Sequence, residues 1–149
     1  MTAVRARLMF LCMIWPVVAF AHPEDFFNKN PGPHRGQMRM AGPYHLELVA
    51  GKDELTLYVS DHANVAIESA GGSAKAILTS GKKRYVIVLM PAGENVLKGS
   101  GEFKLTKTTN VSMLIKLPAG EPQRAQFTLT GTGKTSSKKS TKKKGGTNQ

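Results

Sequence analysis

Residues 44–62, YHLELVAGKDELTLYVSDH, decide the fold because they hold two runs of alternating apolar and polar residues around a short turn signal. Such alternation is typical of β-strands with one buried face. Gly51-Lys52 stands between the runs, and glycine at the first central position favours a two-residue type II′ hairpin turn. The sequence therefore predicts an antiparallel hairpin in which Ala50 pairs with Asp53.

This predicted register also places the two histidines of the hairpin. The leucines of both strands share one face, and His45 lies on the other face, opposite Tyr58. His62 follows in phase, opposite Ala41 and four residues along the strand from His45. At about 3.4 Å per residue, the two imidazoles are then separated by roughly 13 Å, whereas a shared ion needs nitrogen ligands about 2.0 Å away. The hairpin therefore predicts that His45 and His62 do not bind one ion together.

Short β-like runs continue to residue 129, and no segment has the periodicity of an amphipathic helix. Seven to eight short strands with intervening turn residues predict an all-β domain over residues 44–131, a small antiparallel immunoglobulin-like sandwich. A small closed barrel is the alternative. The runs are YHLELVA, ELTLYVS, NVAIES, KAILTS, RYVIVLM, NVLKG, VSMLIKL and QRAQFTL.

The first 21 residues predict a secretory signal peptide. Arg5 and Arg7 precede an apolar run that ends in Ala-Phe-Ala, a favourable cleavage site, and the run is short for a membrane-spanning helix. The only cysteine, Cys12, falls in this segment, so the exported chain is expected to contain no thiol and no disulfide. We therefore expect a periplasmic protein that begins at His22.

The two ends of the exported chain differ from its centre in composition. Residues 22–43 are rich in proline and glycine and predict an extended arm, and residues 132–149 predict a disordered tail of Gly, Ser, Thr and Lys. The net charge of the whole chain is +11, and the six tail lysines supply much of it. The domain itself is nearly balanced, which does not favour specific nucleic-acid binding. The tail could instead contact anionic lipid or another polyanion.

Candidate metal ligands gather in the arm and after the hairpin. His34, Met38 and Met40 precede the first predicted strand, and the predicted register brings residue 41 close to His62. Imidazole together with thioether suits copper, Cu(I) being favoured by methionine and Cu(II) by histidine. The alternative for the two methionines is that they cover an open edge of the sheet.

His22 is a separate candidate. After cleavage its α-amine and ring nitrogen could chelate a metal ion, and Pro23 offers no amide nitrogen to join them. This start resembles that of some periplasmic copper carriers and copper mono-oxygenases. For catalysis the sequence has no paired carboxylates, serine triad or cysteine–histidine pair at recognisable spacing, so we expect a protein that is not an enzyme.

Most of the domain also resembles a known group of proteins. The runs GQMRMAGPYHLELVAGKDELTLYVSDH, AKAILTSGKKRYVIVLMPAGENVLKGSGEF and MLIKLPAGEPQRAQF are similar to a small exported bacterial family found near heavy-metal efflux systems. They also resemble a segment of periplasmic adaptor subunits of cobalt-zinc-cadmium and copper efflux pumps. The resemblance implies a periplasmic β-sandwich with a role in metal tolerance, and His45, Asp61 and His62 match histidine or acid positions of the pattern.

We therefore expect a periplasmic accessory protein in heavy-metal tolerance, which binds copper, or zinc, or assists an efflux system. Its expected partner is an efflux-pump adaptor or another envelope protein. The alternative function is an envelope interaction module without metal chemistry. The candidate metal ligands are His62, Met38, Met40, His34, His22 and His45.

Overall fold

The structure, a computed structural model, describes residues 30–129. The expected signal peptide, His22 and the Lys-rich tail lie outside these residues. The described part of the chain forms eight antiparallel strands and no helix, which confirms the all-β prediction. The strands are β1 (Gln37–Ala41), β2 (Tyr44–Ala50), β3 (Glu54–Ser60), β4 (Ser73–Ser80), β5 (Lys83–Gly93), β6 (Val96–Ser100), β7 (Thr109–Lys116) and β8 (Gln123–Leu129).

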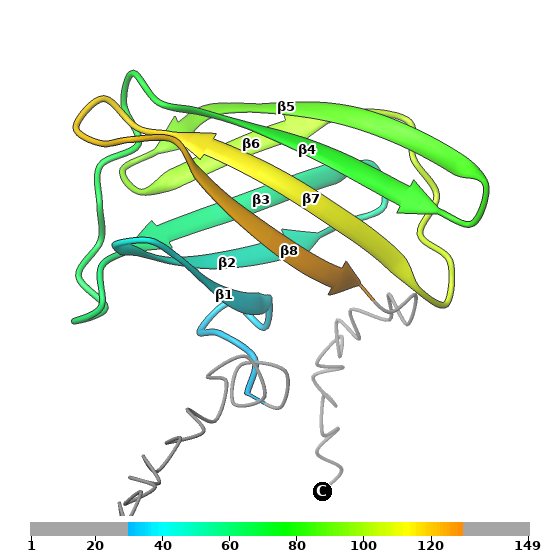
Figure 1. Cartoon of the computed structure of the whole chain (residues 1–149), viewed down its shortest axis with the longest axis horizontal. Helices are drawn as coiled ribbons and strands as arrows, with labels where there is room; N and C mark the ends of the chain where they lie inside the picture. Colours follow the sequence, from blue (N-terminus) through cyan, green and yellow to red (C-terminus); the bar gives the residue numbers. More distant parts are fainter. Residues whose placement is uncertain (1–29, 130–149) are drawn as a thin grey trace, which may run out of the picture.

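All eight strands belong to one sheet, in the order β1-β2-β3-β6-β5-β4-β7-β8. The sheet curls until its two edge strands, β1 and β8, lie side by side (Figure 1). Arg39 Nε donates to the Gln126 carbonyl oxygen at 2.9 Å, and the Thr128 amide donates to Gln37 Oε1 at 2.8 Å. Side chains therefore bridge the seam, and the shape is nearly that of a barrel. The two separate sheets expected of a sandwich are therefore not clearly present, and the single curled sheet comes close to the closed barrel that was the alternative.

Leucines, isoleucines and valines fill the interior because they recur at every second position of the strands. In β7 the pattern is strict, with Val111, Met113 and Ile115 buried and the residues between them exposed. In β2 and β3 the leucines of the hairpin are buried as expected, Leu46 and Leu57 being fully inaccessible to solvent. Tertiary burial of this one face supplies most of the stabilisation of such strands.

The bounds of β2 and β3 match the predicted runs. The predicted register between the two strands, however, is wrong by two residues. Ala50 pairs with Leu55 rather than with Asp53, and His45 pairs with Ser60 rather than with Tyr58. A slip of two residues leaves every side chain on its predicted face, so hydrophobic alternation cannot detect it.

The turn of this hairpin has Lys52 and Asp53 at its tip, and the Gly51 amide donates to the Glu54 carbonyl at 2.7 Å. Gly51 has no positive φ, so the predicted type II′ turn is absent. The Asp53 carbonyl accepts from the amide of Gly101, just beyond β6, at 3.0 Å. Pairing with β6 therefore helps to fix a turn that the local sequence places one residue earlier.

Two further differences concern the first strand and the run NVAIES. Residues 37–41, placed in an extended arm by the sequence, form β1, whose core-facing position 39 holds an arginine rather than an apolar residue. Residues 64–69 form no strand; a single bridge joins Ala66 to Ser60. The outward side of β1 to β3 carries most of the candidate ligands.

Candidate functional site

The outer face of β1, β2 and β3 carries two rows of polar and thioether side chains. In the first row Met40 lies opposite His45, which lies opposite Ser60. In the second row Met38 lies opposite Glu47, which lies opposite Tyr58. Directly opposed residues on one face of an antiparallel pair have Cβ atoms about 5 Å apart. Each row therefore forms a compact set of side chains.

The rings of His45 and His62 stack on each other, with centroids 4.9 Å apart and planes inclined by 20°. The predicted separation of roughly 13 Å between the two imidazoles is therefore wrong. Distance no longer prevents His45 and His62 from binding one ion together. The cause is the corrected register, which brings the end of β3 two residues closer to His45 along the strand. His45 is half-buried and His62 is exposed, so solvent reaches the pair.

A tight loop after β3 holds His62 in this position. Asp61 Oδ1 accepts from the amides of Ala63 and Val65, both at 2.8 Å, and the Asp61 amide donates to the Val65 carbonyl at 2.9 Å. Asn64 adopts a positive φ of 62°, a conformation that asparagine tolerates better than most residues. The carboxylate of Asp61 thus organises the loop and places both His62 and Asn64 over β2.

Each imidazole of the pair contacts an oxygen through one ring nitrogen. His45 Nδ1 lies 3.3 Å from Asn64 Oδ1, and His62 Nε2 lies 3.2 Å from the Gly42 carbonyl. A carbonyl only accepts, so the second contact assigns the hydrogen of His62 to Nε2 and the lone pair to Nδ1. Gly42 itself has φ of 57°, and a Cβ there would lie against the side-chain amide of Gln123, so this turn favours glycine.

Met40 is the thioether nearest to the histidine pair in register. It is 40% exposed and lies directly across from His45 on the same face. Met38 is half-buried, lies one row further along and faces Glu47. The register therefore places Met40, rather than Met38, beside His45.

The second row is organised around the carboxylate of Glu47, which is only 3% exposed. Glu47 Oε1 accepts from the amides of His34 and Gly36, each at 2.8 Å. Glu47 Oε2 lies 2.8 Å from His34 Nδ1. The ring of His34 lies parallel to that of Tyr58, with centroids 3.6 Å apart. His34 is thus committed to a carboxylate and an aromatic ring rather than to the histidine pair.

The segment that carries His34 fits over Glu47 because it contains two glycines. A Cβ on Gly32 would lie 2.3 Å from Glu47 Cδ, and one on Gly36 would lie 2.7 Å from Glu47 Cγ. The Gly32 amide donates to the Gly36 carbonyl at 2.9 Å and closes the loop. Glu47 is not predicted as a site residue, although the sequence has a charged residue in the middle of this strand and a glycine-flanked histidine before it.

Among residues 30–129, no three side chains of the types His, Cys, Asp and Glu lie close enough together to hold one metal ion. The structure therefore brings His45 and His62 together but does not group His34 with them. His22, the remaining candidate, falls outside the described residues. A metal ion on this face would have two imidazoles within reach, and the thioether beside them in register is that of Met40.

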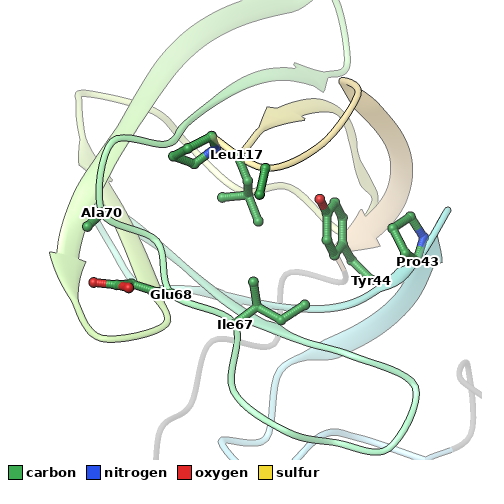
Figure 2. Close-up of a pocket in the computed structure, with 8 residues that line it drawn as sticks. Pro43, Tyr44, Ile67, Glu68, Ala70 and Leu117 are labelled. Atoms are coloured by element: carbon green, nitrogen blue, oxygen red, sulfur yellow. The ribbon is translucent and has the colours of Figure 1, made fainter.

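A pocket of about 520 Å³ opens near the start of β2. Figure 2 shows Tyr44, Ile67 and Leu117 turned toward it, with the carboxylate of Glu68 at its margin. Pro43 and Tyr44, which line it, directly precede His45 in the chain. The lining is mostly apolar, so it offers shape and apolar contact rather than a set of catalytic groups.

Comparison with known proteins yields no relative: no protein-family model, no curated protein and no solved structure matches the chain. Within residues 30–129 the structure contains no apolar helix of the length needed to cross a membrane. The function of this chain is therefore inferred from the geometry of the site.

Proposed function

We propose that this protein is a periplasmic accessory protein in heavy-metal tolerance that binds one copper ion on the outer face of β1 to β3. The ligands are His45, His62 and Met40. The observation that carries the proposal is the contact between the two imidazoles, whose centroids are 4.9 Å apart on an exposed surface. The physiological setting belongs to the proposal and comes from the expected similarity of the strand sequences to exported proteins found near metal efflux systems.

The type of ligand favours copper, and Cu(I) in particular. Two imidazoles suit several transition metals, whereas a soft thioether selects Cu(I). Met40 provides that thioether, directly across the strand pair from His45. The described residues place no carboxylate or thiolate with the two histidines as a third ligand, which zinc normally uses.

Binding requires only local adjustment. The lone pair of His62 lies on Nδ1 when Nε2 donates to the Gly42 carbonyl, so coordination through Nδ1 keeps that hydrogen bond. Such a hydrogen bond on the second ring nitrogen is the usual way in which a metal-bound histidine is oriented. Asp61 acts one step further out, by holding the loop that carries His62.

Titration of the exported chain with Cu(I), in competition with a chromophoric Cu(I) chelator, tests the proposal. We expect one equivalent to bind, with shifts of the His45 and His62 ring resonances and of the Met40 methyl resonance. His45→Ala and His62→Ala should each abolish competition, and Met40→Leu should weaken binding at least about tenfold, because even outer partners of metal ligands contribute that much.

Two control variants separate ligation from general surface effects. Met90→Leu changes a second exposed methionine, on β5, and should leave Cu(I) affinity unchanged. His34→Gln removes the imidazole that contacts Glu47 and should also leave it unchanged. Ring resonances that do not move at one equivalent of Cu(I), or an equal loss of affinity in the Met90 variant, would refute the proposal.

A further inference from the structure

The outer face of β4, β5, β7 and β8 carries a continuous aliphatic surface. Val86, Val88 and Met90 of β5 are 54–55% exposed, and Leu114 of β7 is 40% exposed. Ile77 of β4 lies opposite Val86 and completes the surface. We call these five residues the aliphatic patch. Single exposed apolar side chains are common, but a contiguous patch on one face indicates an interaction site.

Pairing between the strands makes the patch continuous. Lys75 lies opposite Val88 on one side and opposite Leu114 on the other. The hydrocarbon stem of a lysine in this position covers apolar surface while its ammonium group stays in water. Lys75 therefore stands between the β5 and β7 parts of the patch, where such a stem would connect them.

Most of the charged side chains around the patch are basic. Strands β4, β5, β7 and β8 contain no aspartate or glutamate. Arg124 lies opposite Leu114. Lys98 of β6 lies opposite Met90 and pairs with Glu54 of β3 at 3.2 Å. The nearest acids in the chain, Glu94 and Glu121, follow β5 and precede β8 in the turns at the strand ends. The basic residues of the four strands are Lys75, Lys83, Arg84, Lys116 and Arg124.

We infer that this face docks on a partner protein whose surface presents an apolar strip bordered by carboxylates. The complementary charge follows from Lys75, Arg84 and Arg124, which have no acidic residue on these four strands. Pairing of this face with the same face of a second copy would place like charges opposite one another, which is unfavourable. The outward positions of these four strands carry no Trp, Tyr or Phe, the residues that anchor proteins at a membrane interface. The patch also lies on the strands rather than on projecting loops. Both features favour a protein rather than a membrane as the occupant. This surface is separate from the proposed copper site.

A designed peptide provides the probe for the test. An amphipathic helix of about 18 residues, with a leucine stripe flanked by glutamates, has the required chemistry, since 18 residues make five helical turns. We expect it to bind the exported chain and to shift the amide resonances of Val86, Val88 and Leu114. The same peptide with lysine in place of glutamate should not bind. Raising the salt concentration from 0.15 M to 1 M should weaken binding, because the Debye length falls from about 8 Å to about 3 Å.

Matched variants separate the patch from overall charge and hydrophobicity. The pair Lys75→Glu and Arg84→Glu should weaken binding at least about tenfold, since it reverses two charges that face the partner. Lys104→Glu with Lys107→Glu makes the same change of net charge in the loop before β7 and should have no effect. Val88→Ser should weaken binding, whereas Val65→Ser, which alters an exposed valine of another loop, should not.

Several results would overturn the inference. These are failure of the acidic peptide to bind, equal binding of the lysine peptide, and loss of binding only in the Lys104 and Lys107 variant. Sedimentation with phosphatidylglycerol vesicles that depends on Lys75 and Arg84 would identify an anionic membrane as the occupant instead. A monomer–dimer equilibrium abolished by Val88→Ser would identify a second copy of the chain. In each case copper binding by His45 and His62 is measured independently, so failure here does not bear on the proposed function.

Discussion

His34 and Glu47 meet over the outer face of β2, with His34 Nδ1 2.8 Å from Glu47 Oε2, although 13 residues separate them in the chain. The amides of His34 and Gly36 donate to the other carboxylate oxygen. Three donors thus converge on one buried carboxylate. This contact fastens residues 32–36 across β2 and β3, and it also accounts for the orientation of the His34 ring over Tyr58.

Replacement of Glu47 by glutamine should lower the free energy of unfolding by about 1–3 kcal/mol, because it leaves buried donors with a weaker, neutral acceptor. Urea unfolding of the variant and the parent chain measures the difference. Glu54→Gln is the control: Glu54 pairs with Lys98 at 3.2 Å, and both side chains are nearly half exposed. That variant should change stability by less than about 0.5 kcal/mol. Equal losses in the two variants would contradict the role assigned to the buried carboxylate.

Gly36→Ala should also destabilise the chain and loosen the loop over Glu47. The added Cβ would lie 2.7 Å from both Glu47 Cγ and the Leu48 carbonyl oxygen, so the loop or the carboxylate must move. We expect a loss of about 1–3 kcal/mol, typical of overpacking a tight contact, and loss of the His34–Tyr58 ring-current shifts in the NMR spectrum.

Gly51→Ala is the matched comparison for that substitution. Its nearest contact would be the Glu54 carbonyl oxygen at 3.4 Å, and Gly51 has no positive φ. Its stability should therefore remain within about 0.5 kcal/mol of the parent. A large loss would instead support the type II′ turn that the sequence predicts at this position, since that turn requires a positive φ at its first central residue.

The sequence predicts strands well in this protein where one face is uniformly apolar. The bounds of β2 and β3 follow directly from alternation, and their leucines are buried. The strand β1 escapes prediction because Arg39 takes a core-facing position, where its guanidinium donates to the carbonyls of Met38 and Gln126. Side-chain closure of a barrel seam leaves no apolar pattern in the sequence.

The candidate site shows the same division between local and tertiary information. The sequence identifies His45, His62 and Met40 as candidate ligands, but it predicts that the two histidines lie far apart. The alternation fits the predicted register and the actual register equally well, so it cannot choose between them. The contact between them depends on a turn fixed partly by β6 and on a loop organised by Asp61. Asn64 and Glu47 were not identified, since their partners lie 19 and 13 residues away.

The corrected register can be tested with paired cysteines in a chain that lacks Cys12. Val49 and Thr56 are directly opposed, so Val49→Cys with Thr56→Cys should form a disulfide on mild oxidation. The predicted register would instead oppose Val49 and Glu54, which in the structure are diagonal neighbours about 7–8 Å apart. Cysteines at that distance are not bridged without backbone movement. Thiol titration and mass spectrometry after oxidation distinguish the two pairs, and preferential bridging of positions 49 and 54 would overturn the observed register.

Asp61→Ala should weaken Cu(I) binding by about 10- to 100-fold, the range found when the groups that orient metal ligands are removed. The substitution removes an acceptor for two backbone amides and thereby frees the loop that holds His62 against His45. The ligands themselves remain, so binding should be weakened rather than abolished, in contrast to His62→Ala. Chelator competition measures the affinity, and NMR follows the loss of mutual ring-current shifts between the two imidazoles. If Asp61→Ala separates the rings and Cu(I) affinity stays unchanged, the stacked pair is not the preorganised part of the site.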